Sequence, residues 1–203
     1  QDSSGEIYTA DYLILTVPLG YLKKNLIEFT PKLSKSKVKA IERLAMFNMN
    51  KVFVEFEEKF WPDTDFVSYV QYPLILNFAV NFHKVNGKNL LIFMVADTEY
   101  EVIKGKTVDE LKFFLLEKFS KIYPGKNINI TNILKTSWND DPFTFGSFSE
   151  PAGHEYLRRK FMVPEGRLIF DGEHTEPKWN AFVYGAYKSG IRAANQILDK
   201  IHK

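Results

Sequence analysis

Lys51 is the first residue whose type and position could support chemistry. The segment Lys51–Phe56 alternates in polarity, which predicts a β-strand with Lys51 on the same face as Phe53 and Glu55. A lysine at a strand end commonly lays its apolar stem along the surface and keeps its charge in water, and the spacing alone favours this interpretation. The alternative is a lysine directed into a cleft, where burial and neighbouring groups adapt its amine to chemistry.

A second candidate is the segment Phe170–Thr175, which follows a predicted short strand and precedes a predicted helix. Gly172 lets the backbone approach a ligand closely, and the carboxylate of Glu173 could accept hydrogen bonds from ligand hydroxyls. The residues alone favour a plain loop with a solvated Glu173 and a surface His174. No metal site is predicted, because 4 His and 0 Cys leave no zinc-type spacing.

The last predicted helix, residues 185–201, carries small residues in two rows. The rows are Gly185, Ser189 and Ala193, and Ala186, Gly190 and Ala194. A glycine inside a helix costs about 1 kcal/mol relative to alanine, so something must press closely on this surface. A neighbouring helix or sheet would do so. A cofactor over the helix N-terminus is the alternative, because free amides and partial positive charge there suit an anionic or electron-rich group.

Aromatic side chains form a further candidate. Trp138, Phe143, Phe145 and Phe148 cluster around Gly146, and Phe182 stands just before the last helix. Aromatic residues at such density usually form core. At the mouth of a pocket they could instead hold an amine, by apolar contact when it is neutral and by cation–π attraction when it is charged.

The composition predicts a folded globular chain and excludes several functions. Hydrophobic residues make up 45% and charged residues 26% of the 203 residues, close to the globular average and enough to bury a core. A net charge of +2 from scattered basic residues predicts no nucleic-acid partner, and no apolar stretch has the length that predicts a membrane span. The absence of Cys excludes disulfides, thiolate metal sites and a Cys nucleophile.

Two features of the sequence predict a fragment. It contains no Gly-x-Gly-x-x-Gly pattern, so it lacks a dinucleotide-binding loop of its own. It begins at Gln1 without a Met or a signal-peptide pattern, which is typical of an entry in mid-chain. The sequence does not assign a cellular compartment.

Strands and helices must position these candidates. The apolar run of residues 7–17, ended by Pro18 and Gly20, predicts a strand buried on both faces. Further strands are predicted at residues 52–56, 66–70, 74–82, 90–95, 128–138 and 167–170. Asn86-Gly87 predicts a hairpin turn between two of them.

Two more helices complete the prediction. Residues 34–45 have one apolar face, and Thr107 with Glu110 forms a capping box that begins a helix ending near Tyr123. The middle of the chain therefore predicts antiparallel strands with helices. The two ends predict single strands without partners, so each needs a sheet supplied from elsewhere.

These segments together resemble a known family. The matching stretches are residues 10–22, 29–33, 50–56 with 60–62, 138–149, 166–175 and 183–186 with 189–190. They follow family order across nearly the whole chain, and they resemble flavin-containing amine oxidases, most closely the polyamine oxidases. The chain is similar to the C-terminal part of such an enzyme, without the N-terminal loop that binds the FAD dinucleotide.

The resemblance implies an α+β fold. A mixed, mainly antiparallel sheet with helices would form the substrate-binding domain at residues 31–144. Pieces of an α/β FAD-binding domain would flank it: a strand and connection at residues 1–30, and a return with the C-terminal helix at residues 145–203. The N-terminal FAD-binding portion of the same protein and a small amine are the implied partners, with no nucleic acid or membrane among them.

The resemblance also implies the reaction. A hydride passes from the carbon beside an amine nitrogen to the flavin, the imine is hydrolysed, and hydrogen peroxide forms. A polyamine is the expected substrate, and the 203 residues alone are expected to be inactive. The alternatives are a histone-lysine or amino-acid oxidase of the same superfamily, or a non-catalytic binding domain that retains the fold. Tyr184, which stands where a histidine is common, lends the last alternative slight support.

Site residues follow from the resemblance. Lys51 matches the catalytic lysine that holds a water near the flavin, and Glu173 matches the acid that binds the sugar portion of the cofactor. The residues expected to face the flavin ring are Phe182, Val183, Gly185 and Ala186. The residues expected to hold the amine are Phe148 and Phe182, with Trp138 nearby. Ser147 replaces a cysteine that tethers flavin in some monoamine oxidases, so the FAD is expected to be non-covalent.

Overall fold

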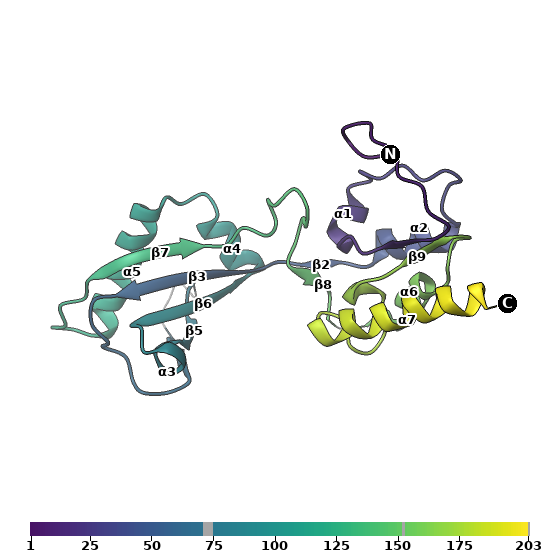
Figure 1. Ribbon diagram of the computed structural model, residues 1–203. Helices are drawn as coiled ribbons and strands as arrows, with labels where there is room; N and C mark the ends of the chain where they lie inside the picture. Colours follow the sequence, from purple (N-terminus) through teal and green to yellow (C-terminus); the bar gives the residue numbers. More distant parts are fainter. Residues whose placement is uncertain (71–74, 152, 203) are drawn as a thin grey trace. The chain divides into compact units, whose positions relative to one another are not determined.

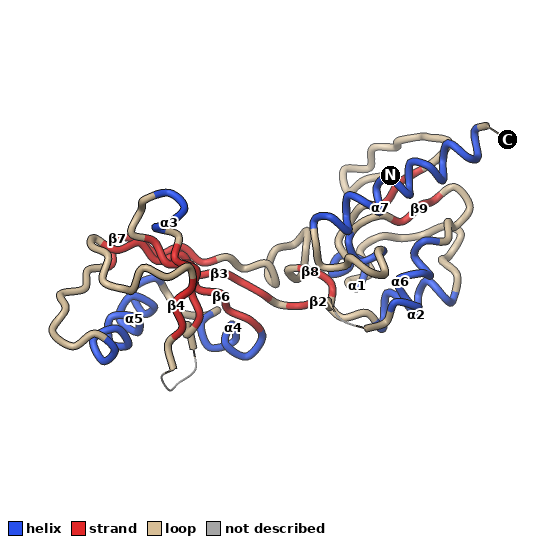
Figure 2. Tube along the Cα trace, turned by 90° about the horizontal axis from the view of Figure 1, so that it is seen from below, coloured by secondary structure: helices blue, strands red, loops and turns tan. Residues whose placement is uncertain are grey.

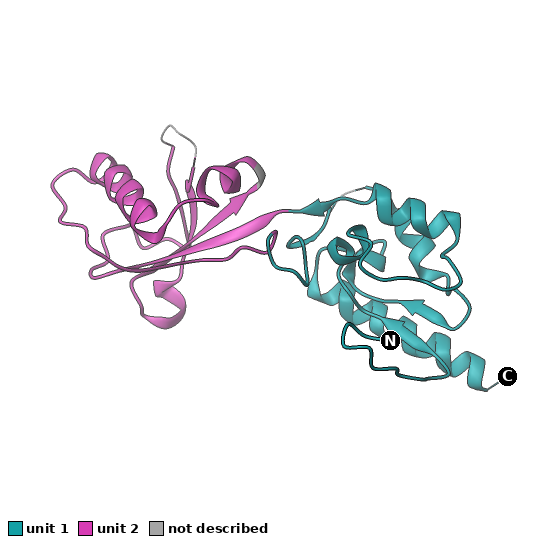
Figure 3. Ribbon diagram, turned by 90° about the horizontal axis from the view of Figure 1, so that it is seen from above, with its two compact units in different colours: residues 1–47, 140–203 teal, residues 48–139 magenta. Residues whose placement is uncertain are grey.

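The computed structural model describes residues 1–70, 75–151 and 153–202, and its elements are labelled in Figure 1. The chain divides into two compact units, coloured in Figure 3. Unit 1 comprises Gln1–Phe47 and Asp140–Lys203, and unit 2 comprises Asn48–Asn139. Helices occur in both units and most strand pairs are antiparallel, so the predicted α+β fold class is confirmed. Unit 2 is narrower than the expected segment 31–144, because residues 31–47 pack with unit 1.

Unit 2 is built on a five-stranded antiparallel sheet. Its strand order is β4 (Phe66–Ser68), β5 (Phe78–Asn81), β6 (Leu90–Ala96), β3 (Met49–Phe56) and β7 (Ile130–Lys135). The long strands β3 and β6 pair from Met49 opposite Ala96 to Glu55 opposite Leu90. The predicted strand at residues 74–82 forms only over 78–81, and Leu74 lies outside the described residues.

Helices α4 (Asp97–Ile103) and α5 (Val108–Ile122) cover one face of this sheet, as Figure 2 shows. The capping box that begins α5 is present, with the Thr107 side chain accepting from the amide of Glu110. Apolar side chains of the sheet and of α5 form one core, including Val52, Val54, Phe93, Leu115 and Phe119. Alternation along β3 therefore has its predicted outcome, with every second residue buried.

The hairpin predicted around Asn86-Gly87 forms, but its connection is longer than a two-residue turn. Strands β5 and β6 do pair antiparallel, but the connection contains the one-turn helix α3 (His83–Asn86). Gly87 ends this helix in the left-handed conformation, with φ of 77°. Gly87 therefore terminates a helix and is not part of a two-residue turn.

Unit 1 joins segments from both ends of the chain. Its elements are β1 (Leu13–Leu15), α1 (Leu19–Lys23), α2 (Lys35–Arg43), β2 (Met46–Phe47), β8 (Phe148–Ser149), α6 (Glu155–Met162), β9 (Leu168–Phe170), the 3₁₀ helix η1 (Glu173–Thr175) and α7 (Val183–Ile201). Strands β2 and β8 pair antiparallel. An apolar core lies among α1, α2, α6 and β9, with Leu19, Ile41, Leu157 and Phe161 among its members.

The predicted unpartnered strands at the two ends are wrong. Strand β1 pairs in parallel with β9, with Leu13 opposite Leu168 and Leu15 opposite Phe170. The predicted strand at residues 7–17 forms only over 13–15, and it is not buried on both faces. Leu13 and Ile14 are 56% and 36% exposed. Within the described residues β1 belongs to a two-stranded sheet, which does not bury these two side chains.

Candidate functional site

Glu173 lies at the centre of a hydrogen-bond network in unit 1. Its Oε1 accepts from the amide of Ser149 over 2.8 Å, and its Oε2 accepts from the Ser149 hydroxyl over 2.7 Å. The amide of Ala181 also donates to Oε2, over 2.6 Å. These three bonds leave one acceptor position of the carboxylate, on Oε1, without a partner in the described part of the chain. Glu173 is half-buried, and three hydrogen bonds fix its carboxylate. The alternative of a plain loop with a solvated Glu173 is therefore contradicted.

Two arginines clamp η1. Arg158 donates to the carbonyl of His174 over 3.1 Å, and Arg192 donates to the carbonyl of Thr175 over 3.3 Å. Arg192 also donates to the Thr175 hydroxyl over 3.0 Å. Because Gly172 has φ of 122°, the chain can turn into η1 with the His174 ring close against it. The segment that carries Glu173 is thus held from both sides.

His174 is buried, so its predicted surface position is wrong. It is 2% exposed and its ring meets Phe161 edge-on, with centroids 5.1 Å apart. Burial, together with the neighbouring charges of Arg158 and Arg192, lowers the pKa of His174 to about 3. The imidazole is therefore neutral near pH 7 and adds no positive charge beside Glu173.

The start of α7 follows directly on this network. Phe182 is its N-cap residue and makes no side-chain capping bond. The amides of Val183 and Tyr184 have no hydrogen-bond partner within the described residues, whereas those of Gly185 and Ala186 bond to the carbonyl of Phe182. An exposed helix N-terminus with free amides attracts an anionic or electron-rich group. The structure thus brings Glu173 and the predicted flavin-facing segment together through Ala181.

Close packing along α7 explains one row of small residues. Gly185, Ser189 and Ala193 are its buried residues. A Cβ on Gly185 would lie 1.8 Å from the carbonyl oxygen of Trp179, so only glycine fits there. The neighbour of Gly185 is therefore the backbone of the preceding loop, whereas Ser189 accepts from the amide of Gly172 and donates to Asp171. A cofactor could therefore approach α7 at its exposed first turn, and it is not needed to explain the buried row.

The predicted aromatic cluster around Gly146 does not form one core. The ring of Phe148 lies 5.2 Å from that of Phe47, and Phe145 lies 6.2 Å from Tyr21. Phe182 is 62% exposed. Within the described residues the rings of Phe148 and Phe182 make no direct contact, so their joint role stays a prediction.

Lys51 and Trp138 belong to unit 2. Lys51 is exposed on β3, on the face opposite the core. This face carries an apolar row across all five strands, formed by Phe66, Val80, Ile92, Phe53 and Leu134 in register. Phe66 and Leu134 at the ends of the row are 58% and 61% exposed. The predicted lysine therefore stands beside an apolar surface.

Asn50 anchors both predicted residues of unit 2. It is fully buried, and its side-chain oxygen accepts from the amide of Trp138 over 2.9 Å and from the Thr136 hydroxyl over 3.2 Å. The Thr136 hydroxyl in turn accepts from the amide of Lys51 over 2.9 Å. Sequence reasoning missed Asn50 and Thr136. The only available signal was a polar Asn50 on the core-facing side of a strand.

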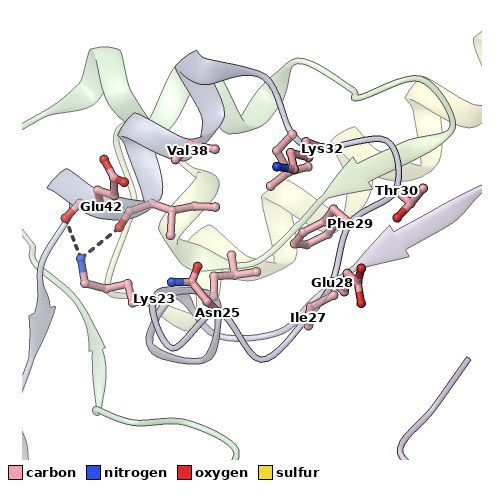
Figure 4. A pocket seen from close by; sticks show the side chains of 12 residues that line it. Lys23, Asn25, Ile27, Glu28, Phe29, Thr30, Lys32, Val38 and Glu42 are labelled. Atoms are coloured by element: carbon pink, nitrogen blue, oxygen red, sulfur yellow. Dashed lines mark hydrogen bonds between the residues drawn. The ribbon is translucent and has the colours of Figure 1, made fainter.

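A separate pocket lies between the loop of residues 22–33 and α2, as Figure 4 shows. It has a volume of about 740 Å³ and combines apolar side chains such as Ile27 and Phe29 with Glu28 and Lys32. Lys23 at its edge donates to the carbonyls of Glu42 and Ile41. None of the predicted site residues lines this pocket.

The structure describes residues 1–70, 75–151 and 153–202. These residues contain no cluster of three or more His, Asp or Glu side chains that could hold a metal ion. None of their helices combines the length and the apolar character needed to cross a membrane.

Comparison with known proteins agrees with the resemblance. A sequence model described as "Flavin containing amine oxidoreductase" matches residues 1–198. Polyamine oxidase 1 of Zea mays is 34% identical over 208 aligned residues, which cover 97% of this chain and 41% of that protein. Polyamine oxidase 7 of Oryza sativa subsp. japonica is also 34% identical, covering 92% of this chain and 41% of that protein. Polyamine oxidase 2 of Arabidopsis thaliana is 31% identical, covering 94% of this chain and 39% of that protein.

The chain thus spans about two fifths of the length of the curated relatives it matches. The matched region includes β3 with Lys51, η1 with Glu173, and the first turns of α7. The match extends over nearly all of the sequence and not over an isolated motif. The chain belongs to the flavin-containing amine oxidoreductase family.

Proposed function

We propose that this chain is the C-terminal part of an FAD-dependent amine oxidase that oxidises a polyamine and produces hydrogen peroxide. An N-terminal FAD-binding portion of the same protein would supply the dinucleotide loop that the 203 residues lack. In this proposal unit 1 belongs to the FAD-binding domain and unit 2 is the substrate-binding domain. When bound, the flavin accepts the hydride and returns the electrons to oxygen.

The network around Glu173 is the observation that carries this proposal. A sugar hydroxyl can donate to the free acceptor position on Oε1, while the other positions are held by Ser149 and Ala181. The unpaired amides of Val183 and Tyr184 suit the electron-rich edge of a flavin. The residues present therefore fit a non-covalent FAD. No cysteine is available to tether it.

Unit 2 would provide the groups that act on the amine. The exposed ammonium of Lys51 can hold a water by hydrogen bonding. The apolar row beside it can contact the methylene segments of a polyamine and exclude water from them. Unit 1 would contribute Phe148 and Phe182, which would orient the amine, and unit 2 would contribute Trp138. Apolar walls favour the neutral amine, whose nitrogen lone pair assists loss of the hydride.

The first experiment compares the protein that includes the N-terminal portion with the 203-residue chain alone. Each is mixed with spermine, spermidine or a monoamine, and hydrogen peroxide is measured. We expect peroxide from the longer protein with the polyamines, and neither bound FAD nor peroxide from the chain alone. Flavin that binds without any amine oxidation would favour a non-catalytic domain. Peroxide with a monoamine only would exclude the polyamine assignment.

The role of Lys51 has its own test. In the longer protein, Lys51→Met should slow flavin reduction or reoxidation by orders of magnitude in stopped-flow absorbance, because the water is no longer held. FAD should stay bound, because this proposal gives Lys51 a role toward the water and gives the sugar portion of the cofactor to Glu173. Lys126→Met, an exposed lysine of the same unit, is the matched control and should leave both rates unchanged. Equal rates in wild type and Lys51→Met would remove Lys51 from its role.

A further inference from the structure

A buried serine, Ser149, connects Glu173 to the buried positive charge of Arg158. Ser149 and Arg158 are each 0% exposed. Nη1 of Arg158 donates to the Ser149 hydroxyl over 2.7 Å, and this hydroxyl donates to Oε2 of Glu173 over 2.7 Å. The amide of Ser149 donates to Oε1. One serine therefore contacts both carboxylate oxygens, and a guanidinium stands behind it.

We propose that Ser149 and Arg158 are positioning residues that hold Glu173 in the orientation in which it binds a sugar hydroxyl of FAD. This inference rests on the proposed function, because it takes the cofactor role of Glu173 as given. It assigns the two residues no contact with cofactor or substrate. They act through Glu173 alone.

The direction of the hydrogen bonds supports this role. A serine hydroxyl has a single proton, and because it accepts from Arg158 that proton points to Glu173. Both bonds involve a charged group, so they are stronger than neutral ones and they polarise each other. The amide of Ala181 adds a third bond, to Oε2, so rotation of the carboxylate group would break hydrogen bonds at both of its oxygens. Its remaining acceptor position on Oε1 is therefore presented in one orientation.

The burial of Arg158 points the same way. Taking a guanidinium out of water costs several kcal/mol, and well-packed apolar residues serve stability equally well. Its helix α6 already packs through Leu157 and Phe161. Arg158 instead donates to three groups outside α6, namely the Ser149 hydroxyl and the carbonyls of Glu150 and His174. These bonds join β8 to η1, which carries Glu173.

The experiment measures the FAD dissociation constant of the protein that includes the N-terminal portion, by flavin fluorescence after removal and return of FAD. Ser149→Ala and Arg158→Met should each weaken FAD binding about tenfold, because one charge-assisted bond is lost. Ser149→Thr keeps the hydroxyl and should restore binding. Arg159→Met is the matched control, because Arg159 is exposed and pairs with Glu155 at the surface. At saturating FAD, the KM for the amine should not change.

A double-mutant cycle separates positioning from general loss of structure. In a Glu173→Gln background, Ser149→Ala and Arg158→Met should cause little further loss, because their effect passes through the missing carboxylate. Losses of equal size in both backgrounds, or an unchanged dissociation constant in Ser149→Ala, would overturn the inference. If Arg158→Met does not fold in a thermal melt, the Ser149→Ala and Ser149→Thr pair decides. If Glu173→Gln itself leaves FAD binding unchanged, the cofactor role of Glu173 fails, and this inference fails with it.

Discussion

The interiors of the two units differ in kind. Unit 2 encloses a continuous apolar core, in which the ring of Phe119 meets those of Phe56, Phe60, Tyr69 and Phe93. Unit 1 has a smaller apolar core and buries a larger set of polar groups, namely Lys37, Ser149, Arg158, His174, Thr175, Asn180 and Ser189. The apolar interior stabilises a sheet, whereas the polar interior fixes the course of loops. The carboxylate of Glu173 is thus held by directed hydrogen bonds, whereas the next residue, His174, also packs against Phe161.

The largest effect is expected from the core of unit 2. Phe119→Ala removes a fully buried ring that contacts four others, so it should lower the free energy of unfolding by about 3–5 kcal/mol. Phe113→Ala on the same helix is the control, because Phe113 is 72% exposed and should change stability by about 0.5 kcal/mol or less. Urea denaturation measures both. Similar losses in the two variants would contradict an apolar core centred on Phe119.

A buried cation in unit 1 should have the next effect. Lys37 is 1% exposed, and its ammonium donates to the carbonyls of Lys160, Phe161 and Val163. Lys37→Met leaves these carbonyls without their donor and should cost about 2–3 kcal/mol in urea denaturation. Lys39→Met, an exposed lysine of the same helix, is the control. A neutral or stabilising Lys37→Met would show that apolar packing serves unit 1 as well as it serves unit 2.

His174 should make unit 1 sensitive to acid. The pKa of His174 is about 3 in the folded chain and about 6.5 in the unfolded chain. Between these values the unfolded state binds the extra proton, so stability falls as the pH falls from 6.5 towards 3. This single group contributes a slope of about 1.4 kcal/mol per pH unit, which His174→Phe should remove.

Unfolding free energies measured at several pH values test this slope. His154→Asn is the control, because His154 is exposed and asparagine tolerates its left-handed backbone. The control should keep the slope of the wild type. An identical slope in wild type and His174→Phe would contradict a buried neutral imidazole.

Local signals predicted unit 2 better than unit 1. The capping box of Thr107 and Glu110 and the alternation that places Lys51 on one strand face with Phe53 and Glu55 depend on residues close in sequence, and both were predicted. The pairing of β1 with β9 joins residues more than a hundred positions apart, so no local pattern revealed it. Helix α6 was not predicted, because its N-cap residue His154 makes no side-chain capping bond and no local pattern marks its start.

The same distinction applies to the candidate site. Glu173 was singled out by its loop and by the family resemblance. The partners that fix it were missed, because a serine and an arginine are ordinarily surface residues and their burial depends on contacts between β8, α6 and η1. His174 was placed at the surface for the same reason. Asn50 was missed because its bonds to Trp138 and Thr136 reach the segment that follows β7, far away in the sequence.

Anaerobic mixing of the FAD-loaded protein with spermine tests the central claim most directly, because it isolates the transfer of a hydride from amine to flavin. We expect the visible absorbance of oxidised flavin to disappear after mixing and to return when oxygen is admitted. In Lys51→Met we expect either the loss of absorbance or its return to be slower than in wild type, while FAD remains bound. A flavin that stays oxidised in the presence of spermine, spermidine and monoamines alike would contradict the proposal that this protein oxidises an amine.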